Sequence, residues 1–300
     1  MPGFDIVAAP PVSAPTVALP PGACDAHSHV FGPFDRFPPL QASVYALPDA
    51  SPDVHAATRA KLGVAYGVLT QPAPYANDPA AMLDAVRRSG GALKAVAATD
   101  SAIDDATLEA WRAGGICGLR FVEMRAPGGQ RYPGSVGADQ LVALAPRMRA
   151  LGLHAQLWAN AADHATLLPD LLRLGVPLVL DHMGCPDPAR GPGDPSFGAI
   201  LDAMKTGQVW VKLSVCRVSR TQPDYPDVKP LHDALVAAMP NRLVWGSDWP
   251  YVRLDPSPDA GRLLDLFAGW LGDDALRHRI LVENPAALYG FPGPSKHAAA

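Results

Sequence analysis

One unit recurs along most of this chain: a short apolar run, a loop, a stretch of helix length that ends in glycine, and the next apolar run. Glycine suits the end of a helix because the residue just past the last turn commonly adopts a left-handed conformation. Gly63, Gly91, Gly115, Gly152, Gly175 and Gly207 stand at such ends. The eight apolar runs are residues 23–30, 65–70, 93–98, 116–122, 153–159, 177–183, 209–214 and 242–249. Each run has the length of a single strand.

The repeat predicts eight parallel strands joined by helices. The runs are mostly apolar on both faces, as buried parallel strands are. Eight such units in 300 residues favour a closed (β/α)8 TIM barrel over an open doubly wound sheet, which would carry a Gly-rich phosphate turn after its first strand. We therefore predict a flexible N-terminal arm over residues 1–21, a single barrel domain over residues 22–291 and a flexible tail over residues 292–300.

The charge and the cysteines argue against several classes of protein. The formal net charge is −4 and no basic cluster is interleaved with aromatic residues, so nucleic acid is not an expected partner. No apolar run approaches membrane-spanning length, and residues 1–22 lack the features of a signal peptide. The four cysteines are far apart, which indicates reduced core residues. We expect a cytoplasmic protein with no membrane partner, and the sequence leaves its oligomeric state unknown.

Polar side chains stand where the predicted strands end, which is where a TIM barrel carries its catalytic groups. His27 and His29 close the first run, Arg120 the fourth, His182 the sixth and Asp248 the eighth. His27 and His29 lie on the same face of their strand, about 6–7 Å apart. Three imidazoles and one carboxylate at one barrel mouth predict a catalytic site.

Two chemical interpretations of this group remain open. In the first, the three histidines and Asp248 bind one divalent ion such as zinc, and Asp248 accepts a proton as the metal-bound water attacks a carbonyl. In the second, the imidazoles polarise the carbonyl oxygen and Asp248 acts directly on water as a general base. Both predict hydrolysis. Lys212 in the seventh run either faces this site or pairs with a carboxylate in the core.

Several segments resemble a known family. These are His27-Ser-His29, Asp181-His182-Met-Gly-Cys-Pro, Trp245-Gly-Ser-Asp248-Trp-Pro and the ending Glu283-Asn-Pro-Ala-Ala-Leu-Tyr-Gly290. They are similar to the signature segments of the amidohydrolase superfamily, and the resemblance runs from about residue 22 to residue 291. Within that superfamily, residues 22–34 and 45–51 look most like the 2-pyrone-4,6-dicarboxylate lactonase group.

The resemblance implies a distorted (β/α)8 barrel that opens a small acidic lactone. In that group the counterpart of Asp248 activates water, the histidines polarise the ester carbonyl, and no metal is required. The alternative is one zinc or manganese ion on His27, His29, His182 and Asp248. A two-metal site is not expected, because the fourth strand has no evident lysine to carry a carboxylate bridge and the fifth does not end in histidine, although His154 stands near its start.

The resemblance also implies residues that bind the substrate. A dicarboxylate calls for planar cations, and Arg120 and Arg217 fall at the positions of carboxylate-binding arginines. Arg125 is a looser candidate, and Tyr45 matches a substrate-facing tyrosine.

Two departures from the family pattern affect the expected substrate. Cys185 stands where the family has arginine, and Trp158 where it has a substrate-side tyrosine. We therefore expect a carboxylated or polyhydroxylated lactone rather than 2-pyrone-4,6-dicarboxylate in particular.

Other functions remain open on the same residues. They are an isomerase of sugar-acid lactones, a mononuclear zinc-dependent hydrolase or decarboxylase, and a non-catalytic ligand-binding protein. They differ in whether solvent oxygen enters the product, whether chelation removes activity and whether the ligand is turned over. The remaining histidines lie on helical or tail segments and are expected to be solvated: His55, His164, His232, His278 and His297.

Overall fold

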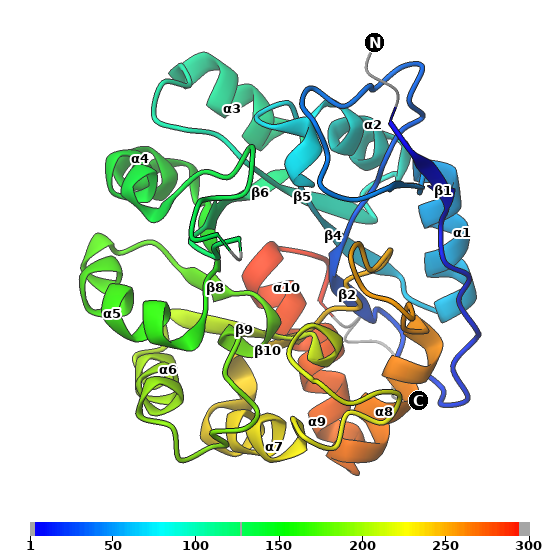
Figure 1. Cartoon of the computed structure of the whole chain (residues 1–300), viewed down its shortest axis with the longest axis vertical. Helices are drawn as coiled ribbons and strands as arrows, with labels where there is room; N and C mark the ends of the chain where they lie inside the picture. The colour runs from blue at the N-terminus through cyan, green and yellow to red at the C-terminus, as the bar shows by residue number, and fades with distance from the viewer. Residues whose placement is uncertain (1–3, 127, 294–300) are drawn as a thin grey trace.

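The computed structural model describes residues 4–126 and 128–293, and eight of its strands form one parallel sheet (Figure 1). They are β2 (Cys24–Ser28), β4 (Tyr66–Thr70), β5 (Leu93–Ala97), β6 (Ile116–Val122), β7 (His154–Trp158), β8 (Leu178–Leu180), β9 (Val209–Leu213) and β10 (Leu243–Trp245). Their order in the sheet is β10-β9-β8-β7-β6-β5-β4-β2, so each strand neighbours the next one in the barrel. Each strand falls within one predicted run, and the prediction of a (β/α)8 barrel is confirmed.

The barrel closes just beyond β10, where the last strand has already ended. Asp248 donates its backbone N–H to the carbonyl of His27 over 2.8 Å, and His29 donates to the carbonyl of Trp249 over 2.9 Å. Gly246 permits this approach, since a Cβ atom there would lie only 2.6 Å from the Cβ of His27. The irregular closure therefore brings the segment that carries Asp248 against the strand that carries both histidines.

Most helices surround the strands in Figure 1, and the last one lies near the centre of the view. They are α1 (Pro52–Leu62), α2 (Ala80–Arg88), α3 (Asp105–Ala113), α4 (Ala138–Leu151), α5 (Ala161–Leu171), α6 (Pro195–Lys205), α7 (Lys229–Ala238) and α8 (Ala260–Leu271), followed by α9 (Asp274–His278) and α10 (Asn284–Tyr289). None of the helices in the described part of the chain has both the length and the apolar character that a membrane crossing requires.

The C-terminal segment covers the end of the barrel that faces away from the strand ends. Tyr289 at the end of α10 lies with its ring centroid 5.5 Å from that of His154, the first residue of β7. Tyr289 and Phe291 belong to an apolar cluster with residues of the strands, among them Val68 and Val179. Access to the barrel interior is therefore from the C-terminal ends of the strands.

Residues 4–21, expected to form a flexible arm, lie against the barrel. β1 (Ile6–Ala8) pairs in parallel with β3 (Leu47–Asp49), and Trp249 donates its indole N–H to the carbonyl of Pro10 over 3.1 Å. The pairing of β1 with β3 holds the chain two residues after Tyr45. Of the predicted tail, residues 294–300 lie outside the described residues.

The prediction of solvated histidines is wrong for three residues. His55, His164 and His232 are each 1% exposed. They sit on the inner faces of their helices, and His55, for example, shares a 2.9 Å hydrogen bond with the hydroxyl of Ser28. His278 is partly exposed, and His297 lies outside the described residues.

The cysteines form no disulfide among the described residues. Cys24, Cys117 and Cys216 are buried and Cys185 is half-buried, in agreement with the prediction of reduced core residues.

Candidate active site

A cavity at the C-terminal ends of the strands gathers six of the eight predicted site residues. Its empty volume is about 730 Å³, open mouth included, and its walls contain His29, Tyr45, Arg120, His182, Arg217 and Asp248. His27 lies directly behind this wall and is fully buried. Arg125 lies outside the cavity, where its exposed guanidinium pairs with Glu123 over 3.1 Å.

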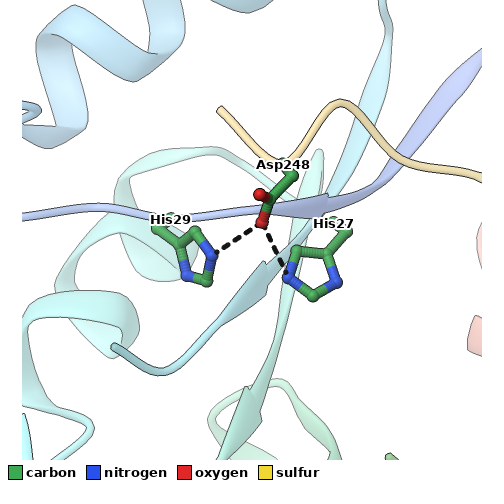
Figure 2. Close-up of side chains that lie close together, drawn as sticks. All are labelled: His27, His29 and Asp248. Atoms are coloured by element: carbon green, nitrogen blue, oxygen red, sulfur yellow. Dashed lines mark hydrogen bonds and ion pairs between the residues drawn. The ribbon is translucent and has the colours of Figure 1, made fainter. Parts of the chain in front are cut away.

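Asp248 stands at the centre of the group (Figure 2). Its Oδ1 atom lies 3.4 Å from Nε2 of His27 and 3.3 Å from Nε2 of His29, while Arg217 donates its Nε–H to Oδ2. The backbone of Asp248 has a φ of 63°, a left-handed conformation that is uncommon outside glycine but tolerated by Asp. Asp248 lies three residues past the end of β10, and this conformation turns its carboxylate toward both histidines.

The environment keeps Asp248 ionised. Burial alone would raise the pKa of its carboxyl group, but the guanidinium of Arg217 and the contact with His29 hold that pKa well below the usual range. In the free protein Asp248 is therefore a carboxylate whose basicity is limited by its ion pair with Arg217.

The hydrogen bonds of His29 restrict its protonation. Its Nδ1 lies 2.7 Å from the backbone carbonyl of Thr70, and because a carbonyl only accepts, Nδ1 carries a proton. Nε2 can then donate to Asp248 only when the ring holds a second proton, and a neutral His29 instead presents a lone pair. His29 and Asp248 are thus arranged to share one proton.

His182 forms another part of the cavity wall. It begins the short helix η3 (His182–Gly184), has a φ of 50°, and packs edge-on against Trp158. Burial lowers the pKa of His182 to about 4, so its ring is neutral at pH 7. Its Nδ1 atom is buried and has no hydrogen-bond partner in the part of the chain that the structure describes.

A buried polar layer supports His27 from below. Lys212, fully buried on β9, places Nζ 3.1 Å from Nδ1 of His27, 3.3 Å from Oδ1 of Asp181 and 2.6 Å from Oε1 of Gln156. Lys212 therefore meets both descriptions that the sequence left open, since it pairs with a carboxylate and contacts a site residue. Burial opposes ionisation of Asp181, yet Lys212 and His27 hold the pKa of Asp181 well below its usual range.

The structure adds an arginine that the sequence analysis did not single out. Arg253 lines the cavity with its guanidinium carbon 4.7 Å from the ring centroid of Tyr132 and 5.7 Å from that of Trp158. Trp158 thus holds a cation at the site by its π face. Arg253 sits in the loop after β10, where no strand periodicity could have placed it.

The donor atoms at the site fit one divalent cation in their arrangement. One ligand atom each of His27, His29 and Asp248 lie within 4.8 Å of one another, and so do those of His27, Asp181 and His182. Such nitrogen and carboxylate sets are typical of mononuclear zinc. Two cations already contact the set formed by His27, His29 and Asp248. Arg217 pairs with Asp248 and Lys212 contacts His27, and both reduce the negative charge that would attract a metal ion.

Comparison with known proteins finds relatives whose names specify action on lactones or pyrones. The family model described as "Amidohydrolase" matches residues 24–291. The chain is 36% identical to a 2-pyrone-4,6-dicarboxylate hydrolase of Comamonas testosteroni, over 92% of this chain and 93% of that protein. It is 31% identical to a D-galactarolactone isomerase of Agrobacterium fabrum, over 92% and 94%. A solved structure from Agrobacterium tumefaciens superposes with a TM-score of 0.81 at 30% identity, covering 93% of this chain and all of that one.

Proposed function

The chain belongs to the amidohydrolase family, and we propose that its single barrel hydrolyses a small lactone with two anionic groups by attack of water on the ester carbonyl. The observation that carries this proposal is the placement of Asp248 between two imidazoles in a cavity rich in arginine. The hydrolase of C. testosteroni, whose name specifies a dicarboxylate, supports the substrate class.

The charges that line the cavity support a dianionic substrate. Arg120, Arg217 and Arg253 contribute three positive charges, and Asp248 contributes one negative charge. These four side chains give the wall a formal charge of +2, which two carboxylates or comparable anions would balance. Planar guanidinium groups suit such anions because they donate two parallel hydrogen bonds.

In the proposed reaction Asp248 takes a proton from water while the water oxygen bonds to the carbonyl carbon. His182 stabilises the negative charge that develops on the carbonyl oxygen, and His29 does so only while its ring holds a second proton on Nε2. The ring C–O bond then breaks, and Asp248 returns the proton to the leaving oxygen, which gives a ring-opened acid. His27, expected from the sequence to contact the carbonyl, is instead assigned to orienting Asp248, because it is buried behind the cavity wall.

Substrate binding would also strengthen the base. An anionic group of the substrate that bonds to Arg217 competes with Asp248 for the same guanidinium. The pKa of Asp248 would then rise from its low value in the free protein, which favours proton transfer from water.

We propose that no metal is required, as the two flanking cations suggest. If one divalent ion binds, His27, His29 and Asp248 would hold it, and it would supply a Lewis acid and a more acidic water. The second candidate function is isomerisation, which the relative named as a D-galactarolactone isomerase favours. It differs from hydrolysis in adding no solvent oxygen to the product.

A panel of lactones with zero, one or two carboxylates tests the proposed substrate class. We expect kcat/KM to rise with each anionic group, and Arg253→Met to lower it by about 10-fold for the dianion and less for the monoanion, as the loss of one charge-assisted contact would. Initial rates by proton release measure this. The dianion proposal fails if the uncharged lactones are the better substrates, or if Arg253→Met affects all of them equally.

A further inference from the structure

Lys212 is a buried ammonium group directly beneath the site, and the atoms around it fix its hydrogen-bond direction. It donates to Oε1 of Gln156 over 2.6 Å, and the Nε2 of the same amide donates to Oδ2 of Asp181 over 3.1 Å. An ammonium group has donors only. The contact of 3.1 Å between Nζ of Lys212 and Nδ1 of His27 is therefore a bond in which His27 accepts.

A competing partner for the same nitrogen is less well placed. Oδ1 of Asp181 lies 3.2 Å from Nδ1 of His27, and a bond between them would require a proton on Nδ1. That oxygen nevertheless has no aligned hydrogen bond within the described residues. The lone pair of Nδ1 thus points at Lys212, and Asp181 serves as the counter-ion of Lys212 at 3.3 Å.

We propose that Lys212 is a positioning residue that fixes His27 as the tautomer protonated on Nε2, so that His27 donates toward Asp248 and is a poor metal ligand. The chain of contacts runs from Lys212 through His27 to Oδ1 of Asp248, which lies 3.4 Å from Nε2 of His27 without an aligned hydrogen bond in the described structure. A proton on Nε2 occupies the lone pair that a metal ion would need. Lys212 thereby selects the metal-independent form of a site whose atoms otherwise suit a divalent ion.

This inference deepens the proposed function, since the role of His27 rests on Asp248 being the base. Its test uses no substrate, so that it can fail or succeed independently of the lactone chemistry. Nitrogen-15 NMR of labelled protein distinguishes the two neutral tautomers, and the His27 signals are identified by their loss in His27→Gln. We expect a pyrrole-type nitrogen at Nε2 and a lone-pair nitrogen at Nδ1. A proton on Nδ1 of the parent protein would overturn the proposal.

The second measurement is zinc affinity, determined by competition with a chromophoric chelator. In Lys212→Met, His27 can donate its Nδ1 proton to Asp181 and turn the lone pair of Nε2 toward Asp248. We expect zinc to bind about 10-fold more tightly or better, the size of effect that groups behind a metal ligand exert. Unchanged affinity in a folded Lys212→Met protein would contradict the proposal.

Two further variants keep the test decisive. Lys205→Met removes an exposed lysine that pairs with Asp202 on α6, and should leave both the tautomer and the zinc affinity at parental values. Asp181→Asn removes the negative charge of the competing acceptor but keeps Lys212, and should leave the Nε2 proton on His27. A shift of that proton to Nδ1 in Asp181→Asn would show that Lys212 does not set the tautomer.

Discussion

Replacing Asp248 with Asn should lower kcat by about 10²- to 10⁴-fold, the usual range for the loss of a general base. The amide has the shape of the carboxylate, but it cannot accept a proton from water. Because the variant removes the one negative charge among the residues that line the cavity, we expect it to bind the dianionic lactone at least as tightly as the parent. Initial rates and calorimetric titration measure the two effects separately.

The pH profile of the parent protein provides the companion measurement. Arg217 holds the pKa of Asp248 well below its usual range against the effect of burial, so the base stays ionised on mild acidification. We therefore expect no loss of kcat/KM through protonation of Asp248 between pH 7 and about pH 5, since even an unperturbed Asp titrates near 4. Near-parental turnover by Asp248→Asn would exclude Asp248 as the base, whatever the pH profile.

Replacing Arg120 with Met should raise KM for a dianionic substrate roughly 10- to 100-fold, since a hydrogen bond to a charged group contributes about 1.5–3 kcal/mol. Arg120 is held in the cavity wall by its 2.9 Å bond to the carbonyl of Gln71, so its position does not depend on the substrate. The loss should be smaller for a lactone with one carboxylate. Steady-state kinetics on the two substrates give the comparison.

The chain offers a matched control for this experiment. Arg125→Met removes the same charge only five residues away, outside the cavity and in an exposed pair with Glu123. Its kinetic constants should equal those of the parent. If Arg125→Met raises KM as much as Arg120→Met does, the effect comes from overall charge and the assignment of Arg120 to substrate binding is wrong.

The residues at the strand ends could be predicted from the sequence because all strands of a parallel barrel end on the same side of the barrel. His27, His29, His182 and Asp248 each follow or close a strand, and the parallel order brings these ends together. Arg125 shows the limit of this rule. It lies three residues past the end of β6 at Val122, where the chain has turned away to pair with Glu123.

Tertiary contacts determine the features that the sequence could not supply. The sequence leaves the role of Lys212 open, because its link to His27 depends on β2 and β9 sharing one interior. Arg253 is placed by a loop that packs on Tyr132 and Trp158, and no local pattern encodes that packing. The burial of His164 also escaped the sequence analysis, because a single polar residue on the inner face of a helix looks the same as one on its outer face.

The most direct test of attack by water is oxygen tracing on protein exhaustively treated with a chelator. The protein is incubated with 2-pyrone-4,6-dicarboxylate and the lactone panel in heavy-oxygen water, and the products are weighed by mass spectrometry. We expect ring-opened acids that contain one solvent oxygen, formed without added metal. A product with the mass of its substrate and no heavy oxygen would identify an isomerase, and activity that returns only with zinc or manganese would contradict metal-independent catalysis by Asp248.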